Sequence, residues 1–156
     1  MDSKFSKTAS EVEGTTTSNY PAEFQKVVTG RRKRRVGDAF HLKNFGVNIT
    51  ELEPGASSAL KHWHEKQDEF IYVLSGEILL RTDKGEETLR QGQFVGFPAG
   101  AENGHQLVNR SNQKAVYLEI GDRTPGEVVH YSEVDLAVKV QDGKYLFTRK
   151  DGSPVA

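Results

Sequence analysis

The sequence predicts an all-β fold, either a sandwich or a barrel, and a double-sheet jelly roll is the best architecture. Three observations support this. Apolar and polar residues alternate over short segments from residue 45 onward, Gly-rich turns separate these segments, and no convincing amphipathic helix is present. At 156 residues the chain is long enough for one domain with a buried core.

We expect four segments along the chain. Residues 1–19 are rich in Ser, Thr, Glu and Lys, which predicts a flexible tail, and residues 20–43 predict an arm that packs on the barrel or on a partner. Residues 44–121 carry the regular strand pattern. Residues 122–156 predict an extension that covers a barrel edge or a dimer interface, because bare edges invite aggregation. The arm and the extension have too few apolar residues for cores of their own, so the sequence predicts a homodimer.

The strand pattern continues through the barrel and beyond it. In order, the expected barrel strands are Phe45–Leu52, Glu69–Leu74, Glu77–Thr82, Glu87–Arg90, Phe94–Phe97, Gln106–Asn109 and Ala115–Ile120. Short turns predict hairpins across Ser75–Gly76, across Asp83–Glu86 and across Arg110–Lys114. After the barrel, Val128–Tyr131 predicts a short strand, and Asp142–Gly143 predicts the turn of a terminal hairpin.

A group of potential metal ligands is the strongest functional signal. Side chains two residues apart in a strand project to the same face, so His62 and His64 point together while Trp63 points away. A strand that begins at Glu69 can pair back and bring its carboxylate to the two imidazoles. His105 supplies a fourth candidate from a second segment marked by Gly and Pro. Imidazole and carboxylate ligands suit divalent manganese, iron, nickel or zinc.

Each histidine also has an ordinary interpretation, because a single His in a strand is usually a hydrogen-bonded structural residue. We apply that interpretation to His41 and His130 and assign them no function. It does not suit the four ligand candidates together, since coincidence would require the right residue type at every position in the right order. The sequence therefore predicts one divalent metal ion, of undetermined identity, bound by these four residues.

The ligand candidates lie in two segments that resemble the two-part signature of the cupin superfamily. The first part is a Gly, two His separated by one residue, a Glu and a closing Gly; the second is a Gly, then Pro-x-Gly, a His and an Asn. The matching residues are Gly55, His62, His64, Glu69, Gly76, Gly92, Pro98, Gly100, His105 and Asn109. The spacing has one extra residue before His62 and two extra before His105, both in turns, where insertions are well tolerated.

The resemblance covers about residues 44–121 and implies a double-stranded β-helix (jelly-roll) barrel with a metal centre. Small cupins with this ligand set include dioxygenases, sugar or sugar-phosphate isomerases, decarboxylases and epimerases. The layout of tail and barrel is similar to a group of small cupins labelled sugar-phosphate isomerase-like. The resemblance thus implies a metal-dependent isomerase, dioxygenase or lyase acting on a small oxygenated molecule. The alternatives are a non-catalytic module for ligand binding, sensing or storage, and a scaffold with an incidental metal.

Strand parity predicts the residues beside the metal. By parity with the glutamate and with the fourth ligand, we expect Ile71, Val73, Leu107 and Asn109 to line the pocket. That wall is largely apolar. It lacks the two or more Arg or Lys residues that a sugar phosphate would need, so the sequence does not identify the substrate.

Composition excludes several classes of function. The chain has no cysteine, which excludes disulfides, thiolate ligands and cysteine nucleophiles. A formal net charge of −1 indicates no general affinity for nucleic acid or membranes. No apolar window is long enough to span a bilayer, and the N-terminus lacks the apolar core of a signal peptide. We therefore expect a soluble cytoplasmic protein.

One basic run, Arg31–Arg35, stands ahead of the barrel. Such a run suits a nuclear signal or a phosphate-binding patch, and its plainer interpretation is a solvated strand or an interface on the barrel. No aromatic residues are interleaved with it for base stacking, so we expect no specific binding of nucleic acid. We also expect that replacing the whole run with Gln leaves metal content and turnover intact.

Overall fold

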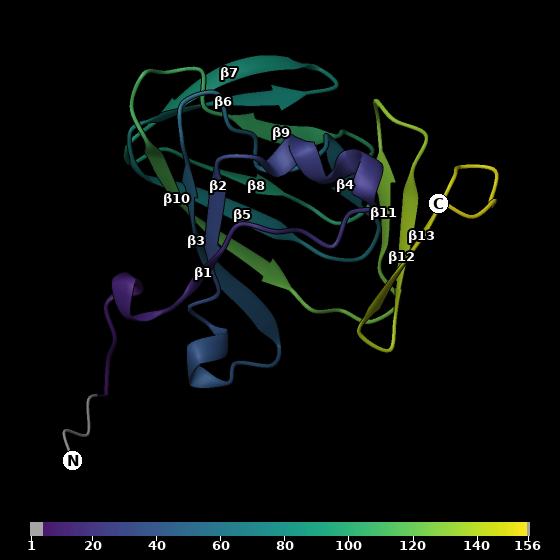
Figure 1. Ribbon diagram of the computed structural model, residues 1–156, viewed down its shortest axis with the longest axis horizontal. Helices are drawn as coiled ribbons and strands as arrows, with labels where there is room; N and C mark the ends of the chain where they lie inside the picture. The colour runs from purple at the N-terminus through teal and green to yellow at the C-terminus, as the bar shows by residue number, and fades with distance from the viewer. Residues whose placement is uncertain (1–4, 156) are drawn as a thin grey trace.

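Two antiparallel sheets form the body of the protein, which the computed structural model describes for residues 5–155 (Figure 1). The order of sheet A is β1 (Gly14–Thr15), β2 (Arg31–Arg34), β3 (Phe45–Leu52), β10 (Ala115–Asp122), β5 (Glu69–Ser75) and β8 (Phe94–Phe97). The order of sheet B is β13 (Lys144–Thr148), β12 (Ala137–Gln141), β11 (Val128–Tyr131), β4 (His62–His64), β9 (His105–Val108), β6 (Glu77–Thr82) and β7 (Gly85–Arg90). The predicted double-sheet jelly roll is confirmed.

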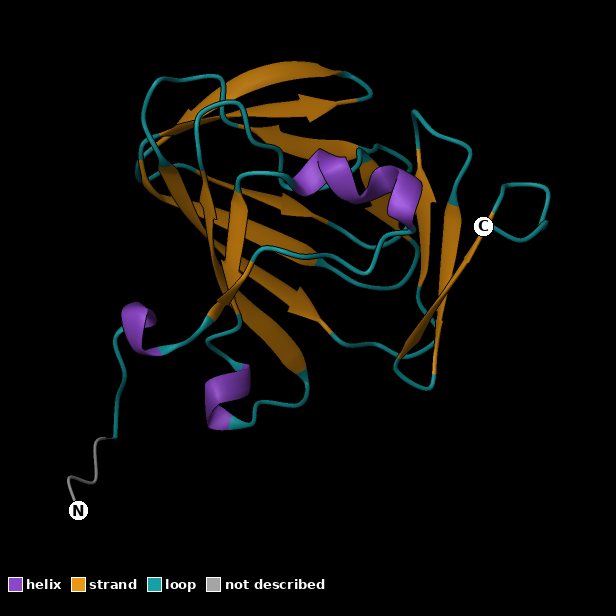
Figure 2. Ribbon diagram, viewed as in Figure 1, coloured by secondary structure: helices purple, strands orange, loops and turns teal. Residues whose placement is uncertain are grey.

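Helical structure in the described residues is limited to three short 3-10 segments (Figure 2). These are η1 (Ala9–Glu11), η2 (Ala22–Val28) and η3 (Asp38–Phe40). They all precede the first long strand, β3, so helix plays no part in the barrel. None of the helices in this part of the chain is long and apolar enough to cross a membrane.

The main hydrophobic core lies between the two sheets. Its buried members are Leu52, Ala56, Ile71, Val73, Ile78, Leu80, Leu89, Leu107, Ala115 and Tyr117. Strand periodicity accounts for this selection: in β5, Ile71 and Val73 are buried while Tyr72 and Leu74 on the other face are exposed. Each fully buried aliphatic side chain stabilises the fold by about 1.5–3 kcal/mol relative to exposure.

Hairpin predictions succeeded only where both strands stay in one sheet. β6 pairs with β7, and β12 pairs with β13 across Asp142 and Gly143, whose positive φ angles suit a tight hairpin turn. The hairpins predicted across Ser75–Gly76 and across Arg110–Lys114 are wrong. At both places the chain crosses between sheets, since β5 and β10 belong to sheet A while β6 and β9 belong to sheet B.

The segments outside the barrel extend its two sheets. β1 pairs with β2 and β2 pairs with β3, so the N-terminal arm adds two strands to sheet A. β11 pairs with β4, so the C-terminal extension adds its strands to sheet B beside β4. A second apolar cluster joins the two segments, with Tyr20 and Phe24 of the arm packed against Val129 and Val138 of the extension. The sequence predicted a flexible tail over residues 1–19, whereas Gly14–Thr15 of that tail form β1 at the edge of sheet A. Residues 1–4 of the tail lie outside the described part of the chain.

Candidate metal centre

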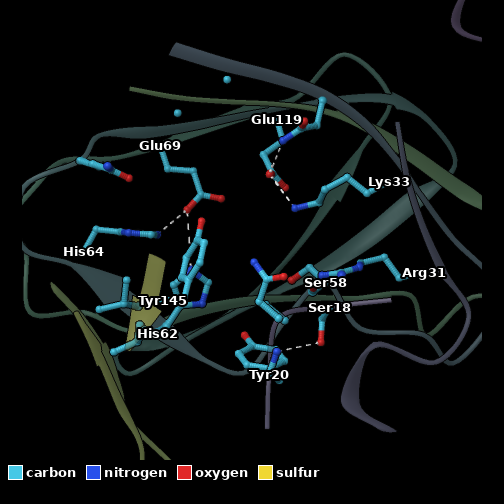
Figure 3. A pocket seen from close by; sticks show the side chains of 18 of the residues that line it. Ser18, Tyr20, Arg31, Lys33, Ser58, His62, His64, Glu69, Glu119 and Tyr145 are labelled. Atoms are coloured by element: carbon cyan, nitrogen blue, oxygen red, sulfur yellow. Dashed lines mark hydrogen bonds and ion pairs between the residues drawn. The ribbon is translucent and has the colours of Figure 1, made fainter. Parts of the chain in front are cut away.

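The four ligand candidates converge inside the barrel. β4 and β9 are neighbours in sheet B, and His62 lies directly opposite His105 in their register. His64 shares the face of His62 because the two are separated by one residue. Glu69 begins β5 in sheet A and reaches the imidazoles from the facing sheet (Figure 3). The predicted pairing between the His62–His64 strand and the Glu69 strand is wrong, because the two strands lie in different sheets.

One carboxylate oxygen lies at the centre of this group. The Oε2 atom of Glu69 is 2.9 Å from Nε2 of His105, 3.4 Å from Nε2 of His64 and 3.9 Å from Nε2 of His62. One possible ligand atom from each of the four residues lies within 4.8 Å of the others. Three imidazole nitrogens and one carboxylate oxygen are a donor set that first-row divalent metals accept. The residues present therefore fit a metal ion.

Contacts behind two of the rings fix their orientation. Nδ1 of His62 lies 2.7 Å from the backbone oxygen of Leu60, and as a donor there it leaves the Nε2 lone pair free. His105 stacks on Phe97 with ring centroids 3.6 Å apart and planes 6° from parallel. These contacts direct both Nε2 atoms toward Glu69 and stabilise the geometry that metal binding requires.

Burial and charge set the protonation of the group. Burial, and then the neighbouring His105, lowers the pKa of His62 to about 3, so this ring is neutral and available as a ligand. Burial alone would raise the pKa of Glu69, but hydrogen bonding with His105 and the contact with His64 hold it well below its usual value. Burial also lowers the pKa of His64, yet the Glu69 carboxylate outweighs burial and the net shift is upward.

A cavity of about 460 Å³ opens beside the ligands, a volume typical of small-molecule sites. Leu107 is one of the residues that line it. The structure places the other three predicted lining residues elsewhere: Ile71 and Val73 lie in the main core, and Asn109 is fully buried with its amide donated to two backbone carbonyls. Strand parity predicts which face of the sheet a residue lies on, but not how far along the barrel it lies from the ligands. The predicted lining therefore differs from the observed lining.

The wall that sheet A contributes is polar, contrary to the apolar wall expected. Lys33 Nζ and Asn48 Nδ2 both donate to Oε1 of Glu119, at 2.9 and 3.0 Å. The three residues come from β2, β3 and β10, and Asn48 is the direct register partner of Glu119. Figure 3 shows the Lys33–Glu119 pair on the side of the cavity away from His64. Sequence reasoning missed this network, although alternation from the buried residue Tyr117 places Glu119 on the inner face.

Alternation along β2 divides the basic run between two faces. The strand interpretation is confirmed, but Arg31, Lys33 and Arg35 line the cavity. Arg31 is only 7% exposed, and its guanidinium donates to the backbone oxygens of Ser58 and Thr17, at 2.6 and 3.1 Å. It therefore ties the arm to the barrel. Arg35 is exposed at the cavity and makes no hydrogen bond or ion pair with residues 5–155, so it is available to a bound anion.

The remaining histidine and tryptophan signals are structural. Trp63 points away from the ligands and stacks on His130, with centroids 4.2 Å apart and planes 15° from parallel. Nε2 of His130 lies 2.6 Å from Oε1 of Glu65, so this ring has a surface carboxylate as its partner. His41 ends η3 in the left-handed conformation. Neither His41 nor His130 joins the ligand group.

A double-sheet jelly roll with a cluster of three histidines and one glutamate inside defines a small β-barrel protein with a candidate metal centre. The model of the Cupin domain family matches residues 48–121. A protein from Silicibacter pomeroyi, described as a sugar phosphate isomerase from a cupin superfamily, is 45% identical over 94% of both chains, with a TM-score of 0.91. The chain therefore belongs to the cupin superfamily, and the resemblance read from residues 44–121 is confirmed.

Two further solved structures are similar to the chain. A putative sugar phosphate isomerase from Acidithiobacillus ferrooxidans is 29% identical, with 81% of this chain and 80% of that chain covered and a TM-score of 0.73. The polyketide cyclase RemF from Streptomyces resistomycificus is 21% identical, with 84% and 87% covered and a TM-score of 0.67, which supports the fold alone. No curated protein matches the chain in sequence.

Proposed function

We propose that this chain is a metal-dependent enzyme that isomerises a small anionic, oxygen-rich molecule, with sugar phosphates as the first substrates to test. The observation that carries the proposal is a cavity with two chemically different walls. The ligand group lies on one wall, and the inward residues of β2, Lys33 and Arg35, lie on another. Two similar proteins, from Silicibacter pomeroyi and Acidithiobacillus ferrooxidans, are described as sugar phosphate isomerases, the second as a putative one, which supports this choice.

In this proposal His62, His64, Glu69 and His105 hold one divalent ion at the base of the cavity. The ion would supply Lewis-acid polarisation of a substrate carbonyl oxygen. The His62 imidazole needs no proton release to bind it, because its pKa is low and its Nδ1 already has an acceptor. The protein contributes a neutral ring and an ionised carboxylate on the spot where the ion would bind.

The opposite wall supplies the groups that can bind an anion and move a proton. Isomerisation of an aldose to a ketose transfers a proton between neighbouring carbons and needs a positioned base. Both contacts of Glu119 within the described residues fall on Oε1, so Oε2 is available to take that proton. Lys33 and Asn48 hold the carboxylate in place. Arg35 is exposed at the cavity and has no partner within residues 5–155. It suits a phosphate group because its guanidinium can donate two parallel hydrogen bonds.

Turnover assays with a panel of aldose and ketose phosphates test this proposal. We expect interconversion of at least one pair, loss of activity after chelation, and recovery when manganese, iron, zinc or nickel is returned. If no member of the panel is converted, the sugar-phosphate assignment is contradicted. A ligand that binds tightly without conversion would favour the sensing or storage alternative, and oxygen uptake by an iron-loaded protein would favour a dioxygenase.

We also propose that the protein forms a homodimer through the outer face of sheet A. This face exposes large apolar side chains: Phe94 is 65% exposed, Phe45 42%, Leu74 38% and Tyr72 37%. Phe94 stacks on Phe70 and Tyr72, so the aromatic residues form one continuous patch. Contiguous exposed apolar patches on a β-sheet face are typical of interfaces.

A further inference from the structure

A carboxylate outside the ligand group lies directly behind one of the ligands. Glu127 precedes β11 in the C-terminal extension and is only 2% exposed. Its Oε2 atom lies 3.5 Å from Nδ1 of His64. Neither of these two buried atoms has a hydrogen-bond partner in the described part of the chain. An unpaired buried carboxylate oxygen is destabilising, so the pair needs an explanation.

Hydrogen bonds to the other oxygen of Glu127 fix the position of this carboxylate. Oε1 accepts three backbone N–H groups, from Glu65 at 3.0 Å, from Lys66 at 3.1 Å and from Val128 at 2.9 Å. These bonds hold the carboxylate at the end of β4. They also leave Oε2 as the atom that faces His64.

We infer that Glu127 is a positioning residue for the metal centre, which accepts the Nδ1 proton of His64 and so presents the Nε2 lone pair of that ring to the ion. This inference rests on the proposed metal centre. His62 provides the precedent within the same strand, since its Nδ1 lies 2.7 Å from a backbone oxygen. The separation of 3.5 Å at His64 is long for a hydrogen bond, so the inference requires the imidazole and the carboxylate to come closer when the ion is bound. A carboxylate behind a ligating imidazole fixes its tautomer and makes it a stronger ligand.

The inference gives the C-terminal extension a role beyond covering an edge. In the pairing of β11 with β4, Val129 is the register partner of His64, so the extension runs alongside the ligand strand. Glu127 lies two residues before that partner. The same pairing that completes sheet B therefore delivers the carboxylate to the back of the ligand.

The first test compares the metal affinity of two matched variants. Glu127→Gln keeps the size of the side chain and an oxygen for the backbone donors, but turns an amide N–H₂ toward the Nδ1–H of His64. Glu65→Gln is the control, because Glu65 is also a carboxylate paired with a histidine, His130, on the exposed side of β4. In competition with a chromophoric chelator, we expect Glu127→Gln to bind zinc about 10–100-fold more weakly and Glu65→Gln to bind it like the natural protein. Equal affinity in all three proteins would overturn the inference.

The second test separates positioning from general stability. In the zinc-loaded natural protein, the Nδ1–H proton of His64 should give a downfield NMR resonance that exchanges slowly with water. Its absence would overturn the inference without recourse to any variant. In a His64→Ala background, Glu127→Gln should weaken zinc binding no further; a second loss would mean that Glu127 acts on the fold rather than on His64. If the natural protein binds no metal at all, the proposed metal centre fails together with this inference, a result distinct from failure at Glu127 alone.

Discussion

Neighbouring residues of β2 face opposite sides of sheet A, and this alternation assigns different roles to the members of one basic run. Sequence alone predicted that Gln at all five positions would leave turnover intact. The geometry restricts that expectation to the outward residues. Lys33 donates to Glu119 in the cavity, whereas Arg32 is half exposed and lies 3.9 Å from Glu51 on the outer face.

The matched pair Lys33→Gln and Arg32→Gln tests this division. We expect Lys33→Gln to lower kcat/KM for an anionic substrate at least tenfold, since it removes a cation from the cavity and releases the Glu119 carboxylate. Arg32→Gln should stay within twofold, because its contact is a surface ion pair. Steady-state kinetics measures both. Equal losses in the two variants would contradict the assignment of the cavity wall.

A second pair of variants tests the ligand assignment one residue at a time. His105→Ala removes a candidate ligand, so metal affinity should fall at least tenfold. His130→Ala is the control, because His130 stacks on Trp63 outside the ligand group. Calorimetric titration with zinc measures both proteins. Unchanged affinity in His105→Ala would remove this residue from the set.

The sequence analysis identified some of the residues of the candidate site and missed others. The four ligand candidates were evident because two occur two residues apart and all four match a motif. Glu119 and Glu127 were missed because the contact partner of each lies far away in the sequence: Lys33 for Glu119, and His64 for Glu127. Those partners become neighbours only through the pairing of β3 with both β2 and β10, and of β11 with β4, which no local pattern encodes.

Asp83 forms the contacts that close the loop before β9. The loop is the place where the spacing of the motif is longer than usual. Asp83 Oδ2 accepts the Gly104 N–H at 2.6 Å and the Ser132 hydroxyl at 2.9 Å, while Oδ1 pairs with Lys61 at 2.9 Å. A Cβ atom on Gly104 would lie 2.1 Å from the Ser132 oxygen, so a side chain there would displace the Ser132 hydroxyl from its present position.

Asp83→Asn should reduce stability in a pH-dependent way. Burial raises the pKa of Asp83, but the contacts with Lys61, Gly104 and Ser132 outweigh it and the net pKa is lowered. A lowered carboxyl pKa stabilises the fold above the unfolded value of about 3.9, and this contribution is lost as pH falls through the folded pKa. We expect the free energy of unfolding of the variant to be about 1 kcal/mol lower at pH 7. This value allows for the partial exposure of Asp83, which weakens its charge interactions. In denaturant titrations the difference should shrink as pH falls below the unfolded value of about 3.9. A difference that is constant with pH would contradict this account.

The positions of most strands could be predicted from the sequence, but some of the pairings between strands could not. Alternation correctly gave the barrel strands of both sheets but not β1, and Asp142–Gly143 gave the terminal hairpin. The crossings after Ser75 and after Asn109 were not predictable, because a short turn fits a hairpin and a sheet-to-sheet corner equally well. The pairing partner is decided by the core that the two sheets bury together.

At the scale of the whole molecule, the outer face of sheet A should mediate dimer formation. Phe94→Glu places a charge at the centre of the exposed aromatic patch, so we expect a monomer at micromolar concentration where the natural protein is a dimer. Leu146→Glu, an exposed apolar position on β13 of the other sheet, should leave the dimer intact. Sedimentation velocity gives the masses. A natural protein that sediments as one chain would contradict the homodimer.

The cavity is also a property of the whole molecule, since arm, barrel and extension each contribute to it. Arg31 of the arm, Glu119 of the barrel and Tyr131 of the extension all line the cavity, and Glu127 of the extension lies behind His64. The sequence located the ligands within the barrel but treated the flanking segments as covers. Only the assembled sheets reveal that these segments complete the chemical environment of the site.

Metal content of the purified protein tests the central claim most directly. Mass spectrometry of the natural protein and of a His62→Ala/His64→Ala double variant, purified in parallel, measures metal ions per chain. The account predicts about one divalent ion per chain in the natural protein and almost none in the double variant, because half of the ligand group is removed. Stoichiometric metal in the double variant would contradict it.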